Sequence, residues 1–337
     1  MNLSLANFRT SELPKHATGT SHSGAFADIR GLDRLVWALI AASAGTVALA
    51  VGTGRFAFLW GTLLFPAAFG GALLAVAWLY RQRDVRIAAA LTGTVQLIAF
   101  SSVAAPLSYV AASLGWPLQD SLFDAADRAL GLDWMALLAF MNDQPTLYAV
   151  LRPIYLCLTP QITVAVLCLA FTGRLVWLRV YTLAFIFAAL VTIAVSAVLP
   201  AEGVWPHYGL TATQSPHVVP VVSTSWPAFH GLRDGSFRAL LALGSEGIIT
   251  FPSLHAALAV ILIAALWPVP RLRWVILGLN MTMLAATPID GSHYFVDVIA
   301  GVVIALLCLF AAQAIAARAL QGQNRTADEL RGLVPGN

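Results

Sequence analysis

Charged residues are absent from a series of long stretches of the chain, and this spacing limits the fold more than any other feature. Each stretch is close to the roughly 17 to 25 residues that a helix needs to cross a bilayer. Only 10% of the 337 residues are charged, whereas a soluble domain carries about a quarter. The sequence therefore predicts an integral membrane protein. The charge-free stretches are residues 35–54, 56–80, 87–119, 153–173, 180–201, 247–270, 274–289 and 298–317.

These stretches are expected to be helical. Backbone polar groups in hydrocarbon must be satisfied within the segment, and the short alternating pattern of a barrel strand is absent. We predict an all-α integral membrane protein with about eight transmembrane helices. The stretch 274–289 is the least regular of them, because it is short and needs its flanking residues to reach the interface.

The basic residues predict the orientation in the membrane. With both termini on one side, 14 of the 19 lysines and arginines fall on that side and 5 on the other. Cytoplasmic loops carry the positive excess, so we expect a multi-pass protein of the cell (inner) membrane with both termini cytoplasmic. No nucleic-acid partner is expected, because the basic residues lie at span ends and form no patch. The five on the extracytoplasmic side are Arg55, Arg128, Arg152, Arg233 and Arg238.

The motif GSHYFVDV places a histidine at the extracytoplasmic end of the last span. His293 and Asp297 are four residues apart, so they lie on one face of a helix within side-chain reach. An aspartate that accepts a hydrogen bond from one imidazole nitrogen fixes the tautomer and leaves a lone pair on the other nitrogen. Such a histidine is prepared to act as a nucleophile.

A second motif, FPSLHAAL, has the residues of a helix N-terminus on the same side. Ser253 is a good capping residue and Pro252 suits a first turn, and such an end favours phosphate. His255 can donate a proton to a leaving oxygen and later withdraw one from a hydroxyl. Arg152 adds positive charge with bidentate geometry for phosphate. Headgroup contact or capping explains each residue alone, but two such motifs on one predicted face favour a site.

The combination of Pro-Ser-x-His with a later His-x-x-x-Asp resembles the type 2 phosphatidic acid phosphatase superfamily, membrane enzymes that act on lipid phosphates through a phosphohistidine intermediate. The resemblance runs from the segment DRALGLDW at 127–134 through Gly301, and it implies a six-helix catalytic bundle. It also implies roles for five residues: His293 as nucleophile, Asp297 as its partner, His255 as acid and base, and Ser253 and Arg152 as ligands of the phosphate oxygens.

The chain departs from the phosphatase pattern at two basic positions. The pattern has a lysine seven residues before the arginine of its Arg-Pro pair, where this chain has Pro145. It has Ser-Arg seven and six residues before the nucleophile, where this chain has Ala286 and Thr287. The triad without this basic set, with His-Tyr at the nucleophile, is similar to the inositol phosphorylceramide synthase and sphingomyelin synthase branch. The segment FHGLRDGS is similar to bacterial members of that branch, and its Arg233 is our candidate to replace lost positive charge.

The resemblance implies a lipid phosphatase or phosphotransferase, with inositolphosphotransferase-like transfer of a phosphoryl or head group as our first expectation. Its partners are a lipid phosphate and, for transfer, a lipid alcohol acceptor. Water as acceptor would instead make a phosphatase of phosphatidic acid or a polyprenyl diphosphate. No cofactor is expected, because positioning and fixed positive charge carry most of phosphoryl transfer. No metal is expected either, because His207, His217 and His230 have spacings unlike a compact ligand motif.

Two other classes of function stay open. A transporter predicts ionisable residues at mid-membrane, but none of the eight stretches contains a charge. An inactive membrane scaffold is suggested by the missing basic ligands, although the two intact histidine motifs argue against it.

The expected organisation follows from the spans and the loops between them. Acids and apolar residues alternate at helical spacing over 120–143, which predicts a helix lying at the outer interface. A long outer loop contains several prolines, and loops of this length are usually functional. The expected parts are a disordered cytoplasmic tail (1–33), N-terminal transmembrane helices (34–119), a catalytic membrane domain (120–319) with the interfacial helix (120–143) and outer loop (202–246), and a cytoplasmic tail (320–337).

Overall fold

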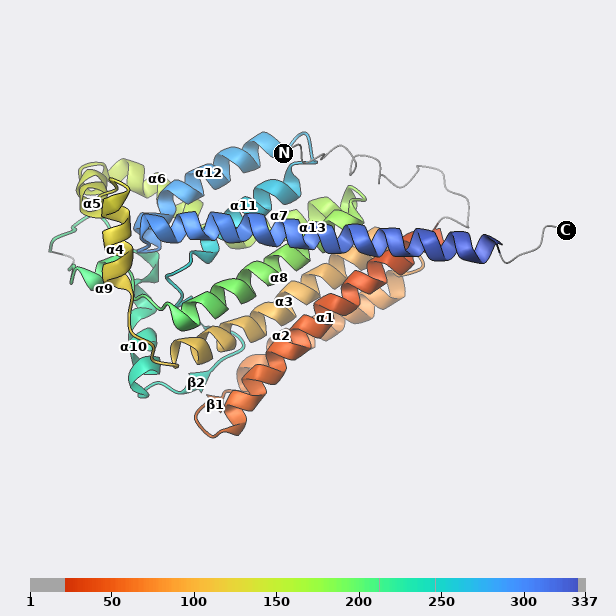
Figure 1. The fold of residues 1–337 in the computed structure, drawn as a ribbon, viewed down its shortest axis with the longest axis horizontal. Helices are drawn as coiled ribbons and strands as arrows, with labels where there is room; N and C mark the ends of the chain where they lie inside the picture. The colour runs from red at the N-terminus through yellow and green to blue at the C-terminus, as the bar shows by residue number, and fades with distance from the viewer. Residues whose placement is uncertain (1–21, 212, 246, 333–337) are drawn as a thin grey trace.

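The computed structural model describes residues 22–211, 213–245 and 247–332, and their side chains between residues 31 and 321. Long helices run beside one another, and short helices cover one end of the bundle (Figure 1). The long helices are α1 (His22–Gly52), α2 (Gly61–Tyr80), α3 (Val85–Ala112), α6 (Pro145–Leu156), α7 (Leu158–Phe171), α8 (Leu175–Val198), α11 (Leu254–Leu266), α12 (Arg273–Asp290) and α13 (Phe295–Gly332). The short elements are β1 (Ala57–Phe58), α4 (Asp120–Ala129), α5 (Trp134–Asp143), α9 (Val204–His207), η2 (Val221–Thr224), α10 (Trp226–Asp234) and β2 (Ala239–Leu240).

Helix α8 lies at the centre of the bundle. It contacts α1, α3, α7, α11 and α13. In its most apolar 18-residue segment 61% of the residues are buried, against 17% in the corresponding segment of α2. A helix that is apolar all round is a buried helix, and Leu178, Leu183 and Ile186 of α8 are all fully buried. Helix α2 packs mainly on α3, so it forms the outer edge.

The prediction of an all-α membrane protein is confirmed. Five helices, α1, α2, α3, α8 and α13, are long and apolar enough to cross a membrane, and α6 with α7, bent by 46° at their junction, would be a sixth. The predicted spans 247–270 and 274–289 correspond to α11 and α12, which have 13 and 18 residues. Helix α11 is shorter than its charge-free stretch because the backbone before its N-cap, Ser253, is not helical.

The helix boundaries near the two termini differ from the predicted ends of the tails. Helix α1 begins at His22, so the end of the expected N-terminal tail is helical, and α13 continues through Gly332 into the expected C-terminal tail. Residues 1–21 and 333–337 lie outside the described residues. The predicted interfacial helix is two helices, α4 and α5, because the chain turns at Gly131 with a φ of +74°, a conformation that favours glycine.

The N-terminal helices are fixed to the rest of the bundle at both ends. At one end, Nε of the buried Arg179 on α8 lies 2.7 Å from Oδ1 of Asp33 on α1, and Gln96 on α3 donates to the same carboxylate. At the other end, β1 pairs in parallel with β2 of the outer loop. That second end carries α4, α5, α9 and α10 (Figure 1), and the two histidine motifs lie beneath them.

Candidate active site

His293 lies in the turn between α12 and α13 and is 3% exposed. Its Nδ1 is 3.2 Å from Oδ2 of Asp297, which is fully buried in the first turn of α13. The same oxygen accepts the backbone N–H of Tyr294 at 2.9 Å. With Nδ1–H donating to the carboxylate, the lone pair of the imidazole lies on Nε2. Burial, and next to it the nearby His255, lowers the pKa of His293, so the ring is neutral near pH 7.

Ser253 contacts the other nitrogen of the His293 ring. Its Oγ lies 3.2 Å from Nε2 of His293 and also accepts the backbone N–H of Ala256, as an N-cap of α11 does. The backbone N–H of Ser253 donates to the carbonyl of Asp297 at 3.1 Å. Helix α11 approaches α13 this closely at Gly301, where an added Cβ would lie 2.3 Å from the carbonyl oxygen of Ser253. Capping and contact with the imidazole are thus both roles of Ser253.

His255 lies in the first turn of α11 and is held by a ring contact. Its imidazole stacks on the phenol ring of Tyr155 from α6, with centroids 4.3 Å apart and planes 10° apart. No described residue makes a hydrogen bond to its ring nitrogens. The ring is close enough to His293 to influence its pKa. The two histidines therefore lie at the same end of the bundle, as the sequence predicted.

Arg152 lies on α6 one turn before Tyr155. Its Nη1 donates to the hydroxyl of Tyr148 at 2.9 Å and to the carbonyl of Val219 at 2.8 Å, and Tyr148 donates to the same carbonyl. Both partners are uncharged. The guanidinium is therefore oriented without losing its positive charge, and neither Nε nor Nη2 donates a hydrogen bond to a described residue.

Asp290, the last residue of α12, carries a buried carboxylate. From the sequence, solvation in a loop was the favoured role for Asp290, and contact with a head-group hydroxyl was the alternative. It is fully buried, and neither of its oxygens has a hydrogen-bond partner among the described residues. It lies near Tyr148, Tyr155 and Arg152. The single proton of the Tyr148 hydroxyl is donated to Val219, so it is not available to Asp290. Burying a carboxylate without hydrogen-bond partners costs free energy. Asp290 is therefore a candidate to accept a hydrogen bond from a bound ligand.

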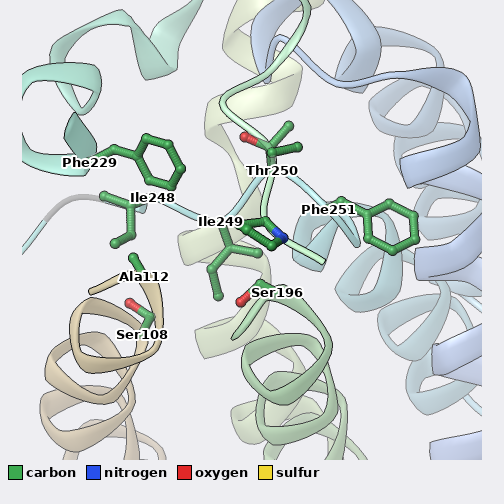
Figure 2. A pocket seen from close by; sticks show the side chains of 10 residues that line it. Ser108, Ala112, Ser196, Phe229, Ile248, Ile249, Thr250 and Phe251 are labelled. Atoms are coloured by element: carbon green, nitrogen blue, oxygen red, sulfur yellow. The ribbon is translucent and has the colours of Figure 1, made fainter. Parts of the chain in front are cut away.

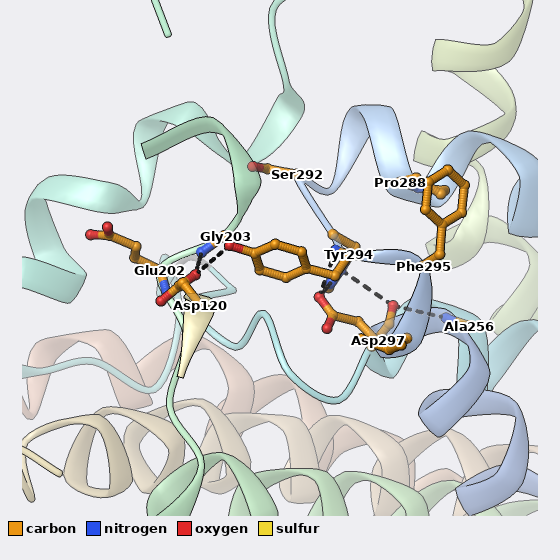
Figure 3. Close-up of polar contacts among 12 residues, drawn as sticks. Asp120, Glu202, Gly203, Ala256, Pro288, Ser292, Tyr294, Phe295 and Asp297 are labelled. Atoms are coloured by element: carbon orange, nitrogen blue, oxygen red, sulfur yellow. Dashed lines mark hydrogen bonds and ion pairs between the residues drawn. The ribbon is translucent and has the colours of Figure 1, made fainter. Parts of the chain in front are cut away.

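Helix α4 positions the turn that carries His293. Both carboxylate oxygens of Asp127 accept backbone N–H groups at the start of α13, from Phe295 and Val296, each at 2.8 Å. Two turns earlier on α4, Asp120 accepts a hydrogen bond from the hydroxyl of Tyr294 at 3.0 Å (Figure 3). Asp127 is 2% exposed, and burial raises its pKa although the two N–H donors act in the opposite direction.

The loop before α9 holds the same turn from another direction. Asp120 accepts the backbone N–H groups of Glu202 and Gly203 (Figure 3), and Ser292 accepts those of Val204 and Trp205 through its carbonyl and its hydroxyl. Gly203 has a φ of +101°, and a Cβ there would lie 2.7 Å from the carbonyl oxygen of Ser292. Only glycine fits this approach.

A small cavity lies behind the segment that leads to Ser253. It is lined by apolar side chains and a few hydroxyls, among them Ser108, Ser196, Phe229 and Thr250 (Figure 2). Its volume is about 10 Å³, enough for about one water molecule. This cavity is too small to take any part of a lipid.

The remaining predicted positions lie apart from the histidines or carry no charge. Arg233, at the end of α10, donates to the carbonyl of Trp116 and lines a different cavity with Arg55 and Arg238.

The positions where the phosphatase pattern has Ser-Arg carry no charge here. Thr287 donates to the carbonyl of Met283 within α12, and Ala286 is buried. Of the predicted cationic ligands, Arg152 is the one that lies on α6, the helix that contacts His255 through Tyr155. Among the described residues, no three His, Cys, Asp or Glu side chains gather closely enough to hold a metal ion.

A family model for the PAP2 superfamily matches residues 122–311. The chain belongs to this superfamily. The match runs from within α4 into the first half of α13, and hence contains His255, His293, Asp297 and Arg152, while α1, α2 and α3 lie before it. No curated protein and no solved structure matches the chain. The family supports phosphatase-type chemistry on lipid phosphoesters by a membrane-embedded enzyme, and it does not distinguish the inositolphosphotransferase branch.

The sequence could not identify the residues that hold the site in place. In the sequence, Asp127 belongs to the segment DRALGLDW that carries the family resemblance, and nothing indicates that Asp120 is a site residue. The two acidic side chains are seven residues apart on one amphipathic helix, and this spacing indicates that they lie on the same face of the helix. Their partners are backbone groups more than 80 residues away, which no pattern in the sequence specifies.

Proposed function

We propose that the protein transfers a phosphoryl or phosphorylated head group from a lipid phosphoester through a covalent intermediate on His293. The contact that supports this most directly is the one between Nδ1 of His293 and Asp297, which leaves Nε2 as the attacking atom. In the membrane, we propose that both termini are cytoplasmic and that the site opens on the extracytoplasmic face of the cell membrane.

In the first step, Nε2 of His293 attacks phosphorus and the bond from phosphorus to the leaving lipid oxygen breaks. His255, in its protonated form, gives that oxygen a proton. Ser253 turns its hydroxyl from Nε2 to a phosphate oxygen, and Arg152 neutralises charge on the equatorial oxygens. Asp297 stabilises the positive charge that develops on the imidazole, as an aspartate partner does in other catalytic triads.

In the second step, the acceptor hydroxyl loses its proton to neutral His255 while its oxygen attacks phosphorus. The bond from phosphorus to Nε2 breaks, and both histidines return to their starting forms. The stacking of His255 on Tyr155 favours one ring position for both proton transfers, which is what a group acting first as acid and then as base requires.

We further propose an alcohol on a second lipid as the acceptor, in an inositolphosphotransferase-like reaction. The observation that favours it is Asp290, whose buried carboxylate has no donor among the described residues. A hydroxyl-bearing head group or acceptor supplies the missing donor, whereas the oxygens of a phosphate monoester would be repelled by the carboxylate. Among the described residues, Arg152 is the one cation on α6, the helix whose Tyr155 stacks on His255. A single positive charge suits a phosphodiester with one negative charge better than a monoester with two.

The experiment compares donors and acceptors on the same purified protein. Wild type, His293→Ala and Asp290→Asn are incubated with labelled phosphatidic acid or phosphatidylinositol, each with and without diacylglycerol or ceramide. We expect a labelled new lipid that requires the acceptor and His293, and a higher ratio of hydrolysis to transfer in Asp290→Asn. Free phosphate as the only His293-dependent product would instead make the protein a phosphatase. No His293-dependent product from either donor would contradict the proposal.

A further inference from the structure

A second cationic site lies away from the histidines, at the junction between the N-terminal helices and the outer loop. Three arginines, Arg55, Arg233 and Arg238, line one cavity of about 250 Å³. Arg55 follows α1, Arg233 ends α10, and Arg238 precedes β2. Three like charges in one cavity repel each other unless an anion joins them.

The three guanidinium groups donate hydrogen bonds to uncharged groups of the described residues, although Glu202 and Asp120 are close enough to act electrostatically on Arg233. Each donates to a backbone carbonyl: Arg55 to Ser113 at 2.6 Å, Arg233 to Trp116 at 2.7 Å, and Arg238 to Gly235 at 2.9 Å. Carbonyl groups orient a guanidinium without removing its charge. Among the described residues, none of the three forms an ion pair, and Nη1 of Arg233 is buried without a partner.

One carboxylate also lines the cavity. Asp234 is exposed and accepts the backbone N–H of Ser236 at 2.8 Å. Against three arginines it leaves a lining with a net charge of about +2. The site therefore suits an anion with several acceptor oxygens, and phosphate is the group whose geometry arginine matches best.

The position of the cavity indicates that the anion is part of a lipid. Large apolar side chains near it face outward, including Trp60, which is 68% exposed, and Trp116, which is 54% exposed. Exposed tryptophans at the ends of membrane helices mark the interface where lipid head groups lie. The cavity is smaller than the roughly 300 to 1,000 Å³ of sites that enclose a drug-sized ligand, so it admits a head group and leaves the acyl chains in the bilayer.

The walls of the cavity are held together by strand pairing. Ala57 and Phe58 of β1 pair with Ala239 and Leu240 of β2, and the backbone N–H of Ala57 donates to the carbonyl of Arg238. Arg55 precedes the part of the chain that matches the superfamily, whereas Arg233 and Arg238 are inside it. The site thus depends on the N-terminal helices and is separate from the histidine motifs.

We propose that Arg55, Arg233 and Arg238 bind the phosphate of a membrane lipid head group at a site distinct from the catalytic histidines. The lipid tethers the hairpin of α1 and α2 to the outer loop at the interface. Inorganic phosphate has the same oxygens but lacks the acyl chains that the neighbouring apolar surface contacts, so it is expected to bind more weakly.

The test measures binding of three probes to the full-length protein in detergent: dihexanoyl-phosphatidylglycerol, inorganic phosphate and dihexanoylglycerol. All variants carry His293→Ala and Arg152→Gln, which remove turnover and weaken phosphate binding at the catalytic site. Arg238→Gln and Arg55→Gln change exposed side chains, and Arg83→Gln changes an exposed arginine elsewhere. We expect each cavity variant to bind the phospholipid about tenfold more weakly, with the Arg83 variant unchanged.

Three results are decisive. Binding of the phospholipid that weakens in both cavity variants and with added salt supports the site, and partial recovery in Arg238→Lys strengthens it. Equal affinity for inorganic phosphate and the phospholipid would overturn the assignment to a lipid. Phospholipid affinity that is unchanged in both cavity variants, or equal affinity for dihexanoylglycerol, would overturn the site itself.

Discussion

Oγ of Ser253 lies 3.2 Å from Nε2 of His293, so the nitrogen that we assign as nucleophile is occupied by a hydroxyl that can turn to a substrate oxygen. The other ring nitrogen faces Asp297. The imidazole is thus fixed from both sides by residues of different helices. Its orientation depends on how α11 and α13 pack.

Replacement of Asp297 by asparagine tests the fixing of the tautomer. The amide can donate to Nδ1, which would move the imidazole proton to Nε2 and block attack. We expect a loss of turnover of roughly 10³-fold or more, by analogy with the effect of such a change in other triads, with little change in substrate binding. Steady-state kinetics on the labelled donor measure this. Turnover within a few-fold of wild type would show that Asp297 does not set the tautomer.

Gly291→Ala tests the close approach of the backbone to the nucleophile. An added Cβ would lie 2.3 Å from Cδ2 and 2.9 Å from Nε2 of His293, so the imidazole has to move. A φ of −90° is open to alanine, but the Cβ would also lie 2.8 Å from the carbonyl oxygen of Thr287, so the end of α12 has to shift slightly as well. We expect activity to fall at least about 100-fold, since small displacements of reacting groups cost that much.

Gly278→Ala is the matched control in the same helix. A Cβ at Gly278 meets no atom within 4 Å, and alanine is a better helix former by about 1 kcal/mol. This variant should keep full activity and unfold at the same or a slightly higher temperature. Equal activity of the two variants would mean that the position of His293 is not restricted by Gly291.

Asp127→Ala tests the support that α4 gives to the turn. It removes the acceptor for the N–H groups of Phe295 and Val296, and loss of a helix cap costs about 0.5 to 2 kcal/mol. We expect a lower unfolding temperature and lower turnover, measured by thermal unfolding in detergent and by kinetics.

Asp124→Ala, on the same helix, is the comparison for this variant. Asp124 pairs with Arg128 and accepts the hydroxyl of Tyr208, contacts outside the turn of the nucleophile. Exposed ion pairs contribute about 0 to 1 kcal/mol, so turnover should change little. A larger loss of turnover in Asp124→Ala than in Asp127→Ala would refute a positioning role for Asp127.

Asp290→Asn tests whether the buried carboxylate is kept for function. Removing a buried charge without partners relieves a desolvation cost, so the variant is expected to be more stable than wild type while transfer to an alcohol decreases. Such an opposition between stability and activity is common at functional sites. The unfolding temperature and the rate of transfer to the alcohol, both measured on the same preparation, test this expectation. A variant that is less stable and equally active would show that Asp290 is a structural residue.

The sequence predicted the membrane fold and the contact between His293 and Asp297 because both depend on local patterns. Helix length is set by bilayer thickness, and the spacing of His293 and Asp297 is one turn of a helix. The stacking of His255 on Tyr155 and the caps made by Asp127 depend instead on helices that are distant in the chain. No single-sequence pattern specifies those partners.

Arg233 illustrates the limit most clearly. Its place beside FPSLHAAL in the sequence suggested a ligand of the substrate phosphate, and that role stays untested. In the fold, its guanidinium is held by Trp116 beside Arg55. The pairing of β1 with β2, each two residues long, brings Arg55 there. Strands this short leave too little periodicity to be recognised.

The most direct test of the account is to trap the phosphorylated enzyme. A lipid-like phosphodiester with a nitrophenol leaving group and labelled phosphorus needs no acid in the first step, whereas the second step still needs His255 as base. In the His255→Ala variant we therefore predict a burst of about one nitrophenol per protein molecule and an acid-labile label on the peptide that contains His293. No burst, or a label on any other residue, would contradict covalent catalysis by His293.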